Sequence, residues 1–145
     1  MGKLKDVLLD PEKRPAVIND CCALVEGEVA RKKGVSGLAI KGGYKVVKAM
    51  RPRMIPETVD FLLDDFVENM EPIVEAHDGS GPVGKYLESR KKDVAGALLA
   101  ITDKKAERSR NKAVKKVYYK LRPMGEKNVM EGVPAVGRLV EKYLK

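Results

Sequence analysis

Tryptophan is absent from this sequence of 145 residues, which also contains only one histidine and two cysteines. An ordinary structural zinc site takes four cysteine or histidine ligands, so the sequence predicts no metal site and no cofactor. The two cysteines, Cys21 and Cys22, are adjacent. Neighbouring side chains on a helix point about 100° apart, which is poor geometry for a disulfide. We therefore expect reduced thiols that pack as small apolar groups.

The scarcity of histidine also limits the chemistry that the chain can perform. Nucleophilic catalysis needs a nucleophile, a base and a group that orients the base, and the sequence offers nothing to place beside the single histidine, His77. His77 is in helical phase with Met70 and Val74, so a packed or helix-ending residue is the simpler interpretation. The sequence favours a protein without enzymatic activity, with no catalytic and no cofactor-binding residues.

Long apolar segments are missing as well. The longest uncharged run, Val94–Thr102, has nine residues, whereas a membrane-spanning helix needs ~20. The first residues also lack the apolar segment of a secretory signal. These absences predict a soluble, basic, cytoplasmic protein with no membrane insertion. Because 43% of the residues are hydrophobic, a chain of this length can bury a sizeable core, and we expect a single helical domain over residues 1–145.

Helical periodicity is present almost throughout the chain. The clearest apolar stripe follows Pro56, with members three, four, seven, eight and eleven residues after the first. It consists of Val59, Leu62, Leu63, Phe66, Val67 and Met70. Pro15 and Pro134 are placed as the first residues of further helices, and Pro72 predicts a kink or a new helix. The sequence therefore predicts an all-α fold, a compact irregular or orthogonal bundle of about seven to nine helices.

One of these helices has a partial repeat earlier in the chain. Ser109 or Asn111 is placed to cap it, Pro123 ends it, and its buried face should hold five residues at helical spacing. These are Ala113, Val114, Val117, Tyr118 and Leu121. Lys45–Pro52 and Lys116–Pro123 are identical at four of eight positions. The similarity indicates two weakly repeated halves, or else chance likeness between amphipathic helices.

Charged residues are segregated along the chain. Residues 31–53 contain eight basic and no acidic side chains, and residues 57–78 contain eight acidic and no basic ones. We expect the acidic face to be solvated and paired with lysines of the preceding helix. The acidic residues concerned are Asp60, Asp64, Glu68, Glu71 and Glu75, and the lysines are Lys41, Lys45 and Lys48.

A third block, residues 104–127, holds ten basic and two acidic residues, a surplus equal to the net charge of +8. Lys112, Lys115, Lys116 and Tyr119 share one helix face there, opposite the apolar one. Lysines contact phosphates without sequence preference, and a tyrosine can stack on a base. Binding of nucleic acid or another polyanion by these four residues is therefore one hypothesis. A membrane-surface role is weaker, because we expect no exposed Trp or Phe to anchor it.

The segment 79–85 has the spacing of a phosphate-binding P-loop, in which Gly79 is followed after four residues by Gly84 and Lys85. In a P-loop the lysine reaches the outer phosphates and a following Ser or Thr binds magnesium. Tyr86 occupies that last position here, and residues 68–77 form an acidic helical pattern where a P-loop has a strand. A flexible connector is favoured, and nucleotide binding at 79–85 is a second alternative.

Several short stretches spread over most of the chain resemble a family of small, helical bacterial proteins, frequent in actinobacteria, known as a domain of unknown function. They are Arg14–Val17, Gly34–Gly37, Ala39–Lys45, Tyr86–Leu87, Ala97–Asp103 and Leu139–Lys142. The resemblance implies a helical, intracellular protein and carries no catalytic residues to this chain. The function that the sequence favours is that of a non-catalytic helical binding or scaffold protein, which acts through a surface patch on an unidentified partner, for example another protein.

Overall fold

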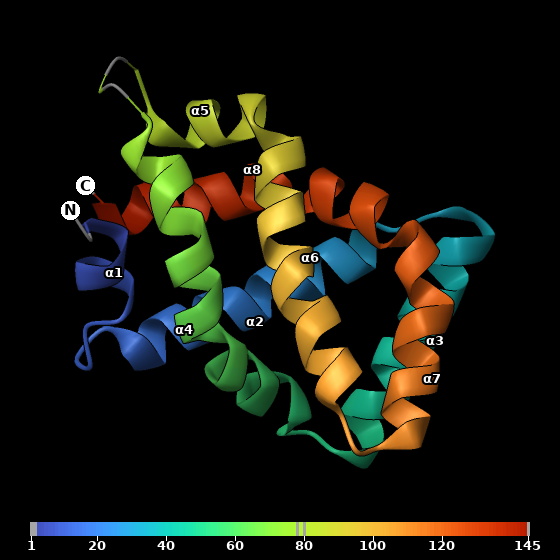
Figure 1. The fold of residues 1–145 in the computed structure, drawn as a ribbon. Coiled ribbons are helices and arrows are strands. Elements are labelled where there is room, and N and C mark those ends of the chain that lie inside the picture. Colours follow the sequence, from blue (N-terminus) through green and yellow to red (C-terminus); the bar gives the residue numbers. More distant parts are fainter. Residues whose placement is uncertain (1–2, 78, 80, 145) are drawn as a thin grey trace.

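The computed structural model describes residues 3–77, 79 and 81–144. Within these residues it contains eight α-helices, one 3-10 helix and no strand, which confirms the predicted all-α fold and number of helices. The helices are α1 (Lys3–Leu8), α2 (Arg14–Arg31), α3 (Gly34–Met50), α4 (Met54–Glu75), α5 (Val83–Ser89), α6 (Lys91–Arg108), α7 (Lys112–Leu121) and α8 (Gly125–Leu144), with the 3-10 helix η1 (Arg122–Met124) between the last two. They cross at varied angles, as expected of an irregular bundle (Figure 1).

The prolines mark where the helices begin and where they continue. Pro15 lies in the first turn of α2, as predicted. α4 continues through Pro72, so no new helix starts there. The prediction that Pro134 starts the last helix is wrong, because α8 begins at Gly125 and includes Pro134. A proline inside a helix removes one backbone hydrogen bond, and the burial of Val133 and Val140 on either side of it holds α8 in place.

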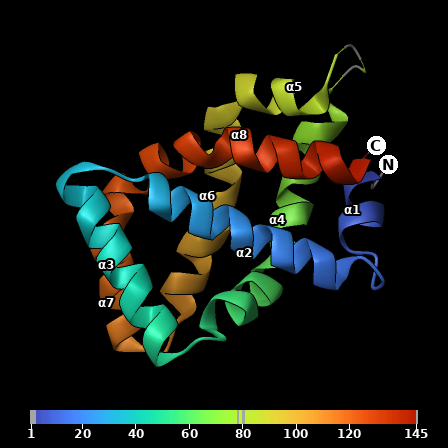
Figure 2. The ribbon, with the colours of Figure 1, turned by 180° about the vertical axis from the view of Figure 1, so that it is seen from behind.

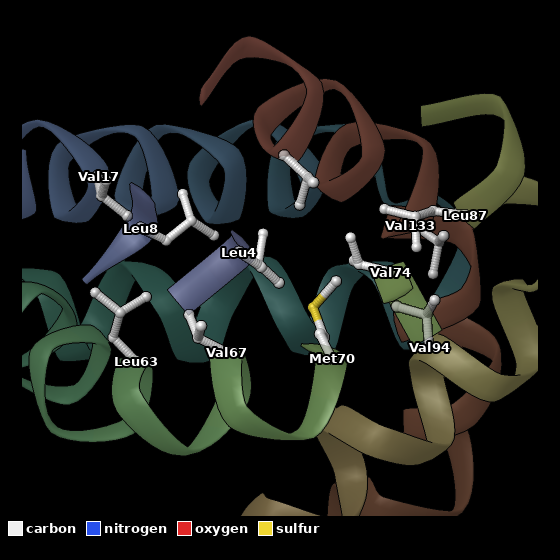
Figure 3. Close-up of a cluster of buried hydrophobic side chains, with 11 residues drawn as sticks. Leu4, Leu8, Val17, Leu63, Val67, Met70, Val74, Leu87, Val94 and Val133 are labelled. Carbon is white, nitrogen blue, oxygen red and sulfur yellow. The ribbon is translucent and has the colours of Figure 1, made fainter. Parts of the chain in front are cut away.

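The core lies where α1, α2, α4, α5, α6 and α8 meet, and its side chains are almost entirely aliphatic (Figure 3). The stripe of α4 that the sequence predicted contributes Leu63, Val67 and Met70, and Val74 extends it beyond Pro72. The other members are Leu4, Leu8, Val17, Leu87, Val94, Val133 and Val140. Six of them, Leu4, Val17, Leu87, Val94, Val133 and Val140, are at most 1% exposed. The core therefore needs no aromatic side chain at its centre.

Ion pairs join α4 to its neighbours, but not in the arrangement expected from the charge blocks. The guanidinium of Arg14 in α2 lies 2.8 Å from Asp60 and 3.1 Å from Asp64. Lys105 of α6 pairs with Asp65 at 3.2 Å. The acidic face is thus solvated and ion-paired as expected, but the prediction that α3 supplies its lysines is wrong. The reason is that α4 packs mainly against α1, α2 and α6 and contacts α3 much less.

Glu71, on the same helix, accepts hydrogen bonds from the backbone N–H groups of Leu4 and Lys5, at 3.1 and 3.0 Å. These two amides belong to the first turn of α1, where the helix itself provides no acceptors. A carboxylate also interacts favourably with the positive end of the helix dipole. Glu71 therefore fixes α1 on α4 and brings Leu4 into the core.

α5 and α8 approach each other closely at two glycines, Gly84 of α5 and Gly137 of α8. Both are buried, and a Cβ atom on Gly137 would lie 2.9 Å from the carbonyl oxygen of Gly84. A Cβ atom on Gly84 would in turn lie 3.1 Å from the carbonyl oxygen of Gly137. The absence of a side chain at both positions lets the two backbones touch.

α3 and α7 stand apart from this core. Both views place them at the edge of the molecule opposite the two termini, with α7 nearer the viewer in Figure 1 and α3 nearer in Figure 2. Their main contacts are with elements next to them in the chain, α2 and α4 for α3 and α6 and η1 for α7. Neither helix contributes a side chain to the core cluster.

Candidate functional site

Most of the large hydrophobic side chains that the fold leaves exposed lie on α3 and α7. Seven of them form what we call the α3–α7 surface: Val35, Leu38, Val46 and Met50 of α3, and Val114, Val117 and Leu121 of α7. Their exposed fractions run from 37% to 87%. Exposed aliphatic residues are common singly, but here they recur on one side of each helix, which is the pattern of a surface that binds a partner.

The apolar face of α7 differs from what the sequence predicted. The prediction that this face is buried is wrong, because no residue of α7 is buried and Val117 is 56% exposed. Asn111 does cap the helix as predicted, since its side-chain oxygen accepts a hydrogen bond from the backbone N–H of Val114 at 3.1 Å.

Polar contacts explain how α7 is held without burying its apolar side. The Tyr118 hydroxyl lies 2.8 Å from the Thr102 hydroxyl of α6 and donates to the carboxylate of Asp103. The guanidinium of Arg122 donates twice to the same carboxylate, at 2.7 and 3.0 Å. The hydrogen bond from Arg122 lowers the pKa of Asp103. These bonds fasten α7 along the side of Tyr118, so its aliphatic residues stay in solvent.

α3 has a similar division of faces. Gly37, Ile40, Tyr44 and Val47 are buried or half-buried and recur at helical spacing, so they form the side that contacts the rest of the fold. The exposed apolar residues recur on another side, with Gly42 among them in the helical sequence. A Cβ atom on Gly42 would meet nothing within 4 Å. No contact inside the chain therefore requires a glycine there.

The internal repeat coincides with this surface. Val46 and Val117 occupy equivalent positions of Lys45–Pro52 and Lys116–Pro123, and each is 56% exposed. Met50 and Leu121, the next equivalent pair of apolar residues, are exposed as well. Each segment also begins inside a helix and ends just past its last residue, before a long helix follows, α4 after α3 and α8 after α7 and η1. The repeat therefore produces two helices with the same apolar positions in solvent.

Comparison with known families identifies the chain. A family model described as a family of unknown function (DUF6918) matches residues 4–144. The chain belongs to this family. The match runs from α1 to the end of α8, so the family includes both α3 and α7, and it confirms the resemblance to a domain of unknown function. Comparisons with curated proteins and with solved structures gave no match.

In this family member, the predicted polyanion-binding face of α7 is largely in solvent. Lys112 and Lys116 are exposed and have no acidic partner among the described residues, and Tyr119 is 48% exposed. Lys115 is different, because it is half-buried and its ammonium donates to the backbone carbonyl of Glu107 at 3.2 Å. The structure thus brings three of the four predicted residues together on the surface and turns the fourth toward the end of α6.

His77 lies at an open cleft of about 460 Å³ near the chain termini. The cleft is lined by Lys3, Val74, Glu75, His77, Gly79, Val83, Glu141 and Leu144. The imidazole packs against Tyr86, with ring centroids 4.9 Å apart. This packing supports the interpretation of His77 as a packed residue just beyond α4.

The P-loop-like segment 79–85 borders the same cleft. Asp78 and Ser80 lie outside the described residues. Gly79 and Gly81 have φ angles of 86° and 80°, a left-handed backbone that favours glycine. The segment follows α4, a helix, and Lys85 lies 3.9 Å from Glu88 within α5. The strand that precedes a P-loop is therefore absent from the described residues, and the glycines are explained by the turn.

Cys21 and Cys22 are both half-buried free thiols. Burial raises the pKa of Cys21 to about 11, and it also raises the pKa of Cys22. A thiol with a raised pKa is a poor nucleophile at neutral pH, because the thiolate is the reactive form. Within the described residues, no group of three or more His, Cys, Asp or Glu is placed to hold a metal ion, and no helix is long and apolar enough to cross a membrane.

Sequence reasoning missed the α3–α7 surface because an amphipathic helix looks the same whether its apolar side meets the core or a partner. It also missed the exposure of Phe61, which is 63% exposed. The ammonium group of Lys105 lies 4.5 Å from the centroid of this ring. The expectation that no phenylalanine is exposed is therefore wrong. The similarity of Lys45–Pro52 and Lys116–Pro123 involves both helices, but by itself it does not say whether their apolar residues are buried or exposed.

Proposed function

We propose that this protein is a non-catalytic helical binding protein and that the α3–α7 surface is its binding site. The observation that carries this proposal is the concentration of seven large aliphatic side chains on two helices that add nothing to the core. Apolar area in water is unfavourable by about 25 cal/mol per Å². A partner that covers this surface recovers that free energy, and the fold itself does not.

The packing of α7 supports the same proposal. Tyr118 and Arg122 already fasten the helix to α6 through Thr102 and Asp103. Val114, Val117 and Leu121 are therefore not needed to attach α7 to the fold. These aliphatic residues recur at helical spacing on an exposed face and make no contribution to the core. Such a face is typical of a surface that binds another helix.

Site-specific photo-crosslinking in cells tests the proposal. A benzophenone amino acid replaces Val46 or Val117, one on each helix, and the control carries it at Glu12, an exposed position that precedes α2. We expect covalent adducts from positions 46 and 117 and none from position 12. The proposal fails if neither surface position gives an adduct, or if position 12 gives the same adducts.

We propose polyanion binding by α7 as a second candidate function, supported by the exposure of Lys112, Lys116 and Tyr119 and by the absence of ion pairs to these two lysines in the part of the chain that the structure describes. Electrophoretic mobility shift with DNA and RNA at about 50 mM salt tests it, because such binding weakens with a slope of about −0.9 per phosphate contact in log K against log salt. Changing Lys112, Lys115 and Lys116 to Glu should abolish the shift.

The matched control changes Lys85, Lys91 and Lys92 to Glu, three exposed lysines outside the block. It alters the net charge by the same amount and should retain binding. Tyr119→Ala should weaken single strands more than duplex, because stacking needs unpaired bases. No shift by the wild-type protein, or equal losses in both triple variants, would rule out this candidate.

A further inference from the structure

We propose that the occupant of the α3–α7 surface is a second copy of this chain, in a two-fold dimer in which α3 of each copy packs against α7 of the other. This inference rests on the proposed function, because it names the partner for the same binding site. Three features of the surface favour a second copy, namely its internal repeat, its area and its shape, and its charge determines how the dimer responds to salt.

The repeat relates the two helices that this dimer would bring together. In such an interface the same patch is used by both copies, so every contact between two different residues occurs twice. Val46 and Met50 of α3 match Val117 and Leu121 of α7 in the repeat, and all four are exposed. α3 of one copy and α7 of the other would therefore present apolar residues to each other at the same helical spacing.

The area also agrees with a dimer. A Val, Leu or Met side chain presents about 60–120 Å² of apolar area, as its transfer free energy and the area coefficient imply. Seven such side chains with exposed fractions of 37–87% leave roughly 250–500 Å² uncovered on each copy. A standard interface buries about 800 Å² per partner, about two thirds of it apolar in homodimers. The aliphatic residues thus supply about half or more of the apolar part, and their neighbours supply the rest.

The shape of the surface favours a helix over a lipid surface. Gly42 lies among the exposed apolar residues of α3, and the space above it is open to beyond 4 Å. A glycine lets another helix backbone or a bulky side chain approach closely, whereas lipid chains gain little from it. Helices that lie on a membrane are usually anchored by aromatic residues on their apolar side. The exposed aromatic residue of α7, Tyr119, lies instead on the side of the lysines.

The charges determine how such a dimer responds to salt. α3 contains three lysines, α7 contains four, and neither helix contains an acidic residue. The lysines of α7 lie on the side away from Val114, Val117 and Leu121, so they stay outside the apolar contact. Two copies bring these like charges near each other, and salt screens that repulsion. Salt should therefore tighten the dimer, whereas it weakens binding to anionic lipids or nucleic acids.

Sedimentation equilibrium of the full chain tests the proposal. We expect a monomer–dimer equilibrium whose Kd falls by about threefold or more between low and high salt. The variant with Val46→Ser and Val117→Ser changes four sites in the dimer, because each substitution occurs in both copies, and should raise Kd by about a hundredfold or more. The control with Ala16→Ser and Ala23→Ser, at exposed positions of α2, should leave Kd unchanged.

Three results would overturn the proposal: a wild-type chain that remains monomeric at high concentration, a dimer that the Val46 and Val117 substitutions leave intact, and a dimer that dissociates as salt rises. Circular dichroism shows that each variant is folded before it is compared. The crosslinking experiment distinguishes failure of the dimer proposal from failure of the proposed binding function. Adducts of a mass other than twice the chain leave the binding surface standing and exclude the second copy, and flotation with phosphatidylglycerol vesicles tests lipid as the occupant.

Discussion

The crossing of α5 and α8 gives a sharp test of the packing, because the same substitution should have opposite effects at two glycines. Gly137→Ala places a Cβ atom 2.9 Å from the carbonyl oxygen and 3.2 Å from the Cα atom of Gly84. Gly96→Ala, in the exposed middle of α6, places it where nothing lies within 4 Å. Both changes replace a glycine inside a helix by the best helix former.

The magnitudes follow from two opposing terms. Replacing Gly by Ala in a helix stabilises it by about 0.8–1 kcal/mol, and Gly96→Ala should show most of this gain. Overpacking costs about 1–3 kcal/mol, and the upper part of that range applies at Gly137 because backbone atoms cannot rotate away. We therefore expect Gly137→Ala to lower the free energy of unfolding by about 1–2 kcal/mol, so that the two variants differ by about 2–3 kcal/mol.

Urea unfolding followed by circular dichroism measures this difference at one protein concentration. Gly84→Ala is the reciprocal test, because its Cβ atom would lie 3.1 Å from the carbonyl oxygen of Gly137, and it should also destabilise. The close contact between α5 and α8 would be refuted if Gly137→Ala were as stable as Gly96→Ala.

Three further predictions concern the core, the thiols and the tyrosines. Leu87→Ala, at a fully buried position of α5, should cost about 2–5 kcal/mol of unfolding free energy, and a loss below about 1 kcal/mol would contradict its place in the core. Cys21, whose pKa burial raises to about 11, should react with iodoacetamide at pH 7.5 far more slowly than a free thiol, and rapid alkylation of the folded chain would contradict its burial. Burial, with the hydrogen bond that Tyr143 donates to Asp20 at 2.5 Å, raises the pKa of Tyr143 to about 12. The folded chain thus holds the Tyr143 proton more tightly than the unfolded chain does. The resulting stability is complete below the ordinary tyrosine pKa of about 10 and is lost as the pH rises toward 12. Ultraviolet titration should show one tyrosine that ionises at higher pH than the others, and Tyr143→Phe should remove that component.

The fold could be predicted from the sequence because helical periodicity and caps are local signals. The stripe at 59–70 was read correctly at Leu63, Val67 and Met70, which lie in the core, while its other members are only half-buried. Asn111 was read correctly as a cap. Pro134 was misread because a proline is favoured in the first turn of a helix and disfavoured inside one, whereas α8 continues through it with Val133 and Val140 buried on either side. The choice depends on tertiary packing, which periodicity does not contain.

The candidate site could be predicted only in part. Lys112, Lys116 and Tyr119 were placed correctly on an exposed face, because lysines on an amphipathic helix face solvent in any fold. Val114 and Val117 were placed in the core, because apolar residues at helical spacing indicate burial without saying against what. Tyr118 decides the matter by its hydrogen bond to Asp103, and a pairing across 15 residues leaves no mark in the sequence.

Hydrogen–deuterium exchange of the full chain at low and high protein concentration tests the central claim most directly. If α3 and α7 form the binding surface between two copies, amide exchange in 34–50 and 112–121 should slow by about tenfold or more as concentration rises, because the partner suppresses local opening. Exchange in the core helix α8 around Val133 and Val140 should change little. Equal exchange of α3 and α7 at both concentrations would contradict the claim.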